Sequence, residues 1–128
     1  MAVRVLIADS SGITRDIMRN HLECGGCQIV AETETVAQTI DLFRTTRPDV
    51  VTLDIGLRSE RGLDALSLFR MVRRESPETS IVMVSASQAP DDNRVYLREG
   101  ALAGSERVGL QMNVRSVEDL QWAMRRLS

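Results

Sequence analysis

The sequence lacks several features, and each absence argues against a class of protein. It contains no lysine, because all sixteen basic side chains are arginine, so no mechanism here can use a lysine amine. No stretch approaches the ~20 apolar residues of a membrane helix, and no signal peptide is recognisable. The net charge of -2 does not favour nucleic acid as a partner. We therefore expect a cytoplasmic protein, without a membrane segment, whose two cysteines stay reduced.

The composition and length fit a single α/β domain over residues 1–128. A chain of this length can bury a hydrophobic core that is stable without disulfides or bound metals. Short, β-branched apolar runs predict strands that are buried on both faces. These runs are Val3–Ala8, Ile29–Glu32, Val50–Leu53 and Ile81–Val84. A fifth strand is expected at Leu102–Val108, although its residues are poor material for a buried strand.

Segments with helical spacing separate these strands, and apolar residues share one face in each. The faces are Ile13, Ile17 and Met18; Val36, Ile40 and Phe43; Leu66, Phe69 and Val72; and Val117, Leu120, Met124 and Leu127. A fourth helix, around Asp91–Glu99, is weakly patterned. Thr35 with Gln38 predicts a capping box, and Pro48 and Pro77 end the helices before them. The alternation predicts a three-layer sandwich, with five parallel strands and five helices.

Polar residues end the predicted strands: Asp9 the first, Asp54 the third, Ser85 the fourth and Arg107 the fifth. In open parallel sheets, ligands bind beyond these ends, where the strand order reverses. Two carboxylates repel each other unless a cation joins them, and Mg²⁺ prefers oxygen ligands. With a hydroxyl and a guanidinium added, the set suits phosphoryl transfer to a carboxylate nucleophile. The alternative is that each Asp only caps a helix or starts a turn.

Four segments resemble the response-regulator receiver domain of two-component signalling, particularly the chemotaxis type. They are "VRVLIADSS", "RPDVVTLDIGLRSERGLDAL", "IVMVSAS" and "LREGALAG". The second is the strongest match, because it contains the Pro-Asp-apolar-Asp pattern and a glycine, Gly62, eight residues after Asp54. The resemblance implies a flavodoxin-like fold whose five-stranded parallel sheet has the order 2-1-3-4-5.

The resemblance also implies a site and a function. Asp54 corresponds to the acceptor of a phosphoryl group, which comes from a sensor histidine kinase or a phosphotransfer protein. Mg²⁺ would be held by Asp9, Asp54 and the backbone carbonyl of Gly56, and Ser85 would contact the phosphoryl group. The chain would then signal to a downstream protein target rather than act as an enzyme. A homodimer through the fourth helix, fifth strand and fifth helix is also implied.

The chain departs from the family pattern at several positions. Ser10 replaces the second acid, so Mg²⁺ should bind weakly; Ser10 either ligates the metal or caps the first helix. Arg107 replaces the family's lysine and could bind the phosphoryl group, pair with Asp9 or Asp54, or lie in solvent. Gly104 replaces the switch aromatic.

These departures leave three hypotheses open: a working, atypical receiver, a phosphorylation-independent pseudo-receiver that binds proteins, and a hydrolase with Asp54 as nucleophile. The hydrolase is the weakest, because Gly56 stands where such phosphatases have a second Asp.

A Cys-x-x-Cys motif, Cys24 to Cys27, follows His21 in the predicted loop after the first helix. Such spacing could hold zinc or form a redox dithiol. The two intervening glycines favour a simpler interpretation, in which they stop the helix.

Overall fold

The computed structural model describes residues 2–54, 56–60 and 62–84, in which strands and helices alternate. The elements are β1 (Arg4–Ala8), α1 (Gly12–Cys24), β2 (Gln28–Thr33), α2 (Val36–Thr46), β3 (Val50–Asp54), α3 (Ala65–Glu75) and β4 (Ser80–Val84). The first four predicted strands are confirmed, and each end lies within one residue of its predicted position. The predicted fifth strand and last two helices lie outside the described residues.

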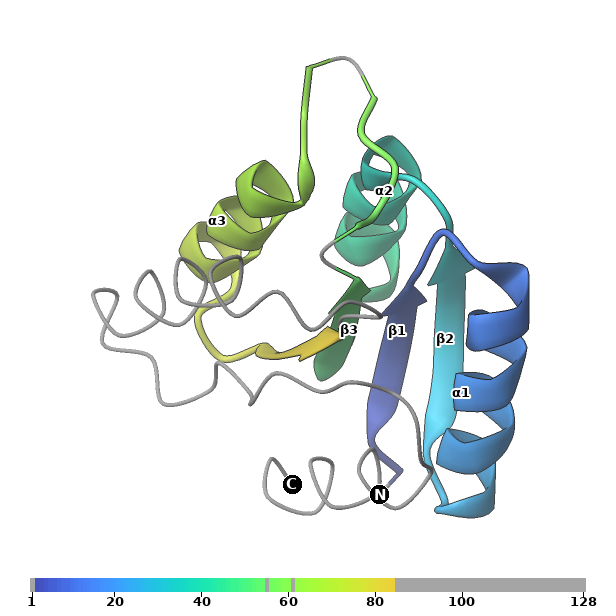
Figure 1. Ribbon diagram of the computed structural model, residues 1–128. Coiled ribbons are helices and arrows are strands. Elements are labelled where there is room, and N and C mark those ends of the chain that lie inside the picture. Colours follow the sequence, from blue (N-terminus) through green and yellow to red (C-terminus); the bar gives the residue numbers. More distant parts are fainter. Residues whose placement is uncertain (1, 55, 61, 85–128) are drawn as a thin grey trace.

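The four strands form one parallel sheet with the order β2-β1-β3-β4, which confirms the predicted order for this part of the chain. Helix α1 covers one face of the sheet, and α2 and α3 cover the other (Figure 1). The first crossover, through α1, leads from β1 to β2 on one face, and the second, through α2, returns on the other face to β3, so that β1 and β3 become neighbours in the sheet. Their carboxyl ends meet at the edge where ligands bind in this kind of sheet.

Alternate residues along the strands supply two separate hydrophobic cores. Leu6 of β1 faces α2 and α3, where it joins Phe43 and Phe69. Ile7 faces the other way and joins Met18 of α1. Burying each such side chain contributes about 1.5–3 kcal/mol, which explains why the central strands are continuously apolar.

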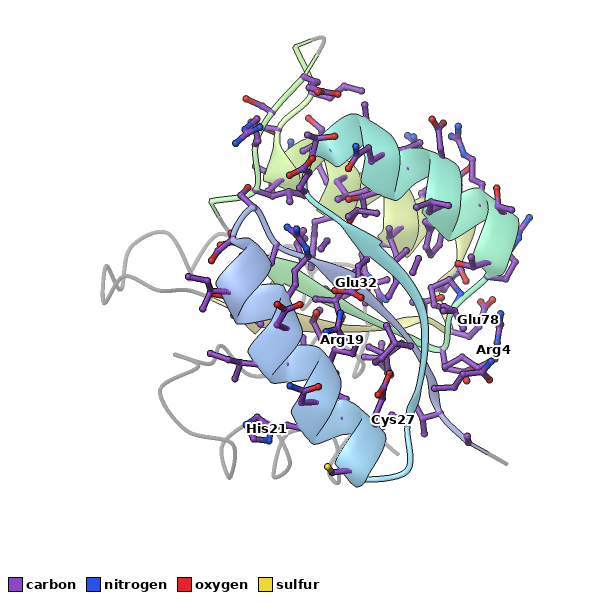
Figure 2. The ribbon with its side chains drawn as sticks, turned by 90° about the vertical axis from the view of Figure 1, so that its right-hand side faces the viewer. Arg4, Arg19, His21, Cys27, Glu32 and Glu78 are labelled. Atoms are coloured by element: carbon purple, nitrogen blue, oxygen red, sulfur yellow. The ribbon has the colours of Figure 1, made fainter. Side chains whose placement is uncertain are left out.

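Strand β2 differs from the prediction that all strands are buried on both faces. Most of its residues are only half-buried, because β2 is the edge strand of the sheet. Its polar residue Glu32 reaches the surface beside Arg19 of α1 (Figure 2). At this edge strand, Ile29 and Ala31 pack against the two cores, and Glu32 pairs with Arg19 at the surface.

The predicted apolar face of α1 is wrong for Ile13 and Ile17 and confirmed for Met18. Ile13 is 76% exposed and Ile17 is 45% exposed, whereas Met18 and Leu22 are buried against the sheet. Met18 and Leu22 are four residues apart and share one face, while Ile13 lies about 140° around the helix from Met18. Both the pair Ile13 and Ile17 and the pair Met18 and Leu22 could form an apolar helix face. Only contact with the sheet determines which pair is buried. In the third helix, Leu66 is likewise only partly buried.

Each described helix begins with a side-chain cap. The hydroxyl of Ser11 accepts a hydrogen bond from Thr14 N in α1, and that of Thr35 accepts one from Gln38 N in α2. In a capping box, the side chain of Gln38 would accept a hydrogen bond from Thr35 N. Here Gln38 Oε1 accepts instead from Glu34 N, the residue before the cap. Helix α3 is capped by the carboxylate of Asp64. Helices α2 and α3 both end before a proline, as predicted.

The Cys-x-x-Cys motif forms the end of α1. Cys27 N donates to Leu22 O at 2.9 Å and Gly26, at φ 90°, donates to Glu23 O at 3.0 Å, which together make a Schellman cap. Cys27 packs against the α1-side core, and burial raises the pKa of its thiol. His21 and Cys27 lie on opposite sides of the last turn of α1 (Figure 2).

The described residues contain no group of three His, Cys, Asp or Glu that could hold a metal ion. The motif forms a helix stop, and among the residues that the structure describes it belongs to no such cluster. Within the same residues, no helix is both long and apolar enough to cross a membrane.

Candidate functional site

The structure brings Asp9 and Asp54 to the ends of two adjacent strands. Ala8 of β1 is paired with Leu53 of β3, so the next residue on each strand is an aspartate. Asp9 is only 5% exposed. Burial raises the pKa of Asp9, and the nearby charge of Asp54 raises it further. Ser85 and Arg107, the other two predicted site residues, lie outside the described residues.

Backbone amides hold one oxygen of each carboxylate. Ser11 N donates to Asp9 Oδ1 at 2.8 Å, and Gly56 N donates to Asp54 Oδ1 at 2.9 Å. Leu57 N also donates to the carbonyl of Asp54, at 3.0 Å. In the described part of the chain, no donor contacts the second oxygen of either carboxylate. Each carboxylate is therefore oriented, and among the described residues one oxygen of each has no donor.

This donor set fits a hard divalent cation. Burial raises the pKa of Asp9 and the nearby charge of Asp54 raises it further, and a cation between the two carboxylates would remove this second effect. Carboxylate and carbonyl oxygens, with waters, are the ligands that Mg²⁺ takes in proteins. The site has only two carboxylates in the described residues, because position 10 is a serine. Low ligand charge predicts weak binding.

Ser10 does not cap the first helix, and this alternative for Ser10 is wrong. Ser11 caps α1 instead. The hydroxyl of Ser10 donates to Glu34 O at 3.3 Å and accepts from Arg58 N at 2.9 Å. Ser10 therefore connects the end of β1 with two other loops at the same edge of the sheet.

Arg15 is a site residue that the sequence reasoning missed. One of its guanidinium nitrogens donates to the carbonyl of Asp9 at 2.6 Å. Its positive charge lowers the pKa of Asp9 and so opposes the larger effect of burial. Arg15 lies one turn after the Ser11 cap, and this position was the only signal in the sequence for the contact.

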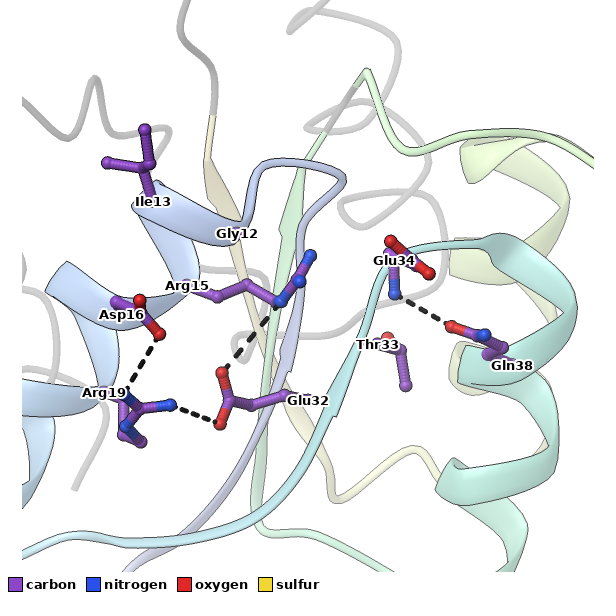
Figure 3. A pocket seen from close by; sticks show the side chains of 9 residues that line it. All are labelled: Gly12, Ile13, Arg15, Asp16, Arg19, Glu32, Thr33, Glu34 and Gln38. Atoms are coloured by element: carbon purple, nitrogen blue, oxygen red, sulfur yellow. Dashed lines mark hydrogen bonds and ion pairs between the residues drawn. The ribbon is translucent and has the colours of Figure 1, made fainter.

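The side chain of Arg15 also lines a groove of about 660 Å³ between α1 and the end of β2 (Figure 3). Within this groove, Arg15 lies 4.0 Å from Glu32, and Arg19 forms ion pairs with Glu32 at 2.9 Å and Asp16 at 3.0 Å. These arginines are paired with acids, so the groove has mixed charge. Arg15 belongs both to this groove and to the contact with Asp9 O.

Comparison with known proteins identifies the family. The profile of the response regulator receiver domain matches residues 5–103. The chain is 33% identical over 86 residues to chemotaxis protein CheY of Bacillus subtilis (strain 168), covering 67% of this chain and 69% of that protein. The isolated REC domain of RcsB from Salmonella enterica serovar Typhimurium, solved with the phosphomimetic BeF3⁻, has a similar structure. Its TM-score is 0.80 at 21% identity, covering 99% of this chain and 88% of that one.

The chain belongs to the response regulator receiver domain family and has its flavodoxin-like fold. Members of this family are signalling modules of two-component systems and generally bind Mg²⁺ at their acidic pocket. The chain is also 35% identical over 88 residues to protein-glutamate methylesterase/protein-glutamine glutaminase 3 of Hahella chejuensis (strain KCTC 2396). This match covers 69% of this chain but only 24% of that enzyme. The similarity therefore concerns a receiver segment and transfers no esterase activity.

Proposed function

We propose that this chain is a phosphoryl-accepting receiver with Asp54 as the acceptor. The observation that supports this most directly is the position of Asp54 beside Asp9, with one carboxylate oxygen held by Gly56 N and the other without a described donor. In the reaction, a carboxylate oxygen of Asp54 attacks the phosphorus of a phosphohistidine. The new O–P bond forms as the N–P bond breaks, and the imidazole leaves with the electron pair.

The residues around Asp54 have separate roles in this proposal. Asp9, Asp54 and the carbonyl of Gly56 would hold Mg²⁺, which when bound neutralises charge on the phosphoryl oxygens. The Ser11 amide and the Arg15 guanidinium favour the ionised form of Asp9, because both lower its pKa against the larger, raising effect of burial. The proposal assigns Ser85 and Arg107 to the phosphoryl oxygens, as hydroxyl donor and fixed cation.

The proposed partners follow from the same assignment. A sensor histidine kinase or phosphotransfer protein would donate the phosphoryl group in the cytoplasm. A downstream protein, or a second copy of the chain, would read the result through the predicted fourth helix, fifth strand and fifth helix. We propose no nucleic-acid or membrane contact, since the net charge is -2 and the described helices include none that could cross a membrane.

The direct test is incubation with acetyl phosphate and Mg²⁺, followed by intact-protein mass spectrometry. The wild-type chain should gain one phosphoryl group, and the gain should disappear in Asp54→Asn and when EDTA replaces Mg²⁺. Asp64→Asn is a matched control, because the Asp64 carboxylate caps α3 through Ser67 N and is not among the proposed site residues. Modification that persists in Asp54→Asn would show that the acceptor is another residue.

The second candidate is a pseudo-receiver that binds proteins without phosphorylation. The observation in its favour is the serine at position 10, which leaves the described niche with two carboxylates. A folded wild-type chain that stays unmodified by acetyl phosphate at saturating Mg²⁺ would favour this candidate.

A further inference from the structure

The hydroxyl of Ser10 joins three separate loops. Ser10 itself follows β1, its acceptor Glu34 O lies between β2 and α2, and its donor Arg58 N lies between β3 and α3. A carbonyl oxygen cannot donate and a backbone amide cannot accept, so the directions of both bonds are fixed. The single hydroxyl proton is directed at Glu34, and a lone pair receives Arg58 N.

Arg58 is held at its other backbone group as well. Val36 N, in the first turn of α2, donates to Arg58 O at 2.9 Å. The preceding side chain, Leu57, is 5% exposed and belongs to the core on the α2 and α3 side. The β3–α3 loop is therefore anchored by Ser10 and Val36, and by the burial of Leu57.

This anchored loop carries the amides that contact Asp54. Gly56 N donates to Asp54 Oδ1 at 2.9 Å, and Leu57 N donates to Asp54 O at 3.0 Å. A shift of residues 57 and 58 would move the Gly56 amide and turn the carboxylate that it orients. Ser10 is the anchor that comes from the end of β1, beside Asp9.

We propose that Ser10 is a positioning residue for the acceptor loop and not a ligand of Mg²⁺. Two of the three hydrogen-bonding positions of its hydroxyl are already used, one toward each neighbouring loop. An ionised aspartate at position 10 could accept from Arg58 N but could not donate to Glu34 O. A serine therefore forms a connection between the three loops that the family's usual acid does not form. The consequence for phosphorylation rests on the proposed function of Asp54, whereas the connection itself does not.

The test compares Ser10→Ala with Ser10→Thr, which keeps a hydroxyl. In Ser10→Ala, hydrogen exchange at the Arg58 amide should accelerate about two- to tenfold, as expected for the loss of one net hydrogen bond. The Gly56 amide resonance should move and modification by acetyl phosphate should slow. Any weakening of Mg²⁺ binding should accompany the faster Arg58 exchange, because the same loop carries Gly56. Ser10→Thr should restore Arg58 protection. Ser11→Ala is the matched control, because it removes the neighbouring hydroxyl, whose hydrogen bond in the described part of the chain is to Thr14 N of α1.

Other results would overturn the proposal. Weaker Mg²⁺ binding in Ser10→Ala, with unchanged Arg58 exchange, would make Ser10 a metal ligand. Unchanged exchange and unchanged Mg²⁺ binding would mean that Ser10 has neither role. If Ser10→Ala does not fold, Ser10→Cys gives the same comparison, because a thiol is a weak donor. If Asp54 is not phosphorylated at all, the Arg58 and Gly56 readouts still decide whether Ser10 holds the loop.

Discussion

At the scale of single residues, Asp9 shows how a buried carboxylate affects stability. Burial and the charge of Asp54 raise its pKa, and these effects exceed the opposing effects of Ser11 N and Arg15. Asp9 therefore binds its proton more tightly in the native than in the unfolded state. Its favourable contribution to stability is complete below the unfolded pKa, near 3.8, and is lost as the pH rises through the higher native pKa. Ionised Asp9 thus destabilises the metal-free fold at neutral pH.

Asp9→Asn should consequently raise the free energy of unfolding at neutral pH in the absence of Mg²⁺. The asparagine oxygen can still accept from Ser11 N, and the repulsion from Asp54 is removed. The advantage over wild type should shrink as the pH falls toward 3.8, where wild-type Asp9 also becomes neutral. Urea denaturation of both chains in EDTA, from acidic to neutral pH, measures this. An Asn variant that is less stable than wild type at every pH would contradict the assignment.

At the scale of elements, a buried chain of threonine hydroxyls joins β2 to α2. Thr39 Oγ1 donates to Thr35 O at 2.7 Å, so its one proton is used. Thr33 must then be the donor in the 2.6 Å contact between Thr33 Oγ1 and Thr39 Oγ1. Both side chains are buried, and Asp9 N donates to Thr33 O at 3.0 Å. The chain of bonds therefore lies directly beside the carboxylate niche.

Replacement of Thr39 should cost more stability than replacement of Thr33. Thr39→Val leaves the Thr33 hydroxyl buried without its acceptor and should cost about 1–3 kcal/mol. Thr33→Val leaves Thr39 bonded to Thr35 O and should cost about 0.5–1.5 kcal/mol. The double variant should cost less than the sum, because the two hydroxyls share one bond. The measurement is the free energy of unfolding of the two single variants and the double variant by chemical denaturation. If both single variants lose the same amount and the double variant loses their sum, the hydroxyls act independently.

The same elements show what the sequence could predict. Local signals were sufficient for β3, whose apolar run ends at Asp54, and for the cap at Thr35, because both depend on neighbouring residues. The face of α1 could not be chosen between Ile13 and Met18, since this depends on contact with the sheet. The hydrogen bond between Ser10 and Arg58 joins residues 48 positions apart and uses a backbone amide. Every residue except proline has such an amide, so the sequence pattern could not predict this bond.

At the scale of the whole molecule, the strand order determines which parts of the sheet a bound cation can join and thereby stabilise. Because β1 and β3 are neighbours, one cation can join Asp9 and Asp54 and thereby two halves of the parallel sheet. A ligand that binds only the native state stabilises it according to its concentration relative to its Kd. Mg²⁺ should therefore raise the stability of the wild-type chain modestly, given two carboxylates.

Ser10→Asp adds a third carboxylate to this niche and should increase the stabilisation by Mg²⁺. A tenfold gain in affinity corresponds to about 1.4 kcal/mol at high Mg²⁺. In EDTA the same variant should be less stable than wild type, because it loses the bond to Glu34 O and adds repulsion near Asp9. Thermal unfolding with and without Mg²⁺ measures both effects, and Mg²⁺ should stabilise Asp9→Asn less than it stabilises wild type. Stabilisation by Mg²⁺ that is identical in all three chains would place the cation elsewhere.

The central claim is that Asp9 and Asp54 form one Mg²⁺-dependent phosphoryl-accepting niche. The most direct measurement is a ¹H–¹⁵N spectrum of the whole chain titrated with beryllofluoride, with and without Mg²⁺. The account predicts Mg²⁺-dependent shifts of the amides of Ser11, Gly56 and Leu57 in wild type, and none in Asp54→Asn. A folded wild-type chain whose spectrum does not change at saturating Mg²⁺ and beryllofluoride would contradict the account.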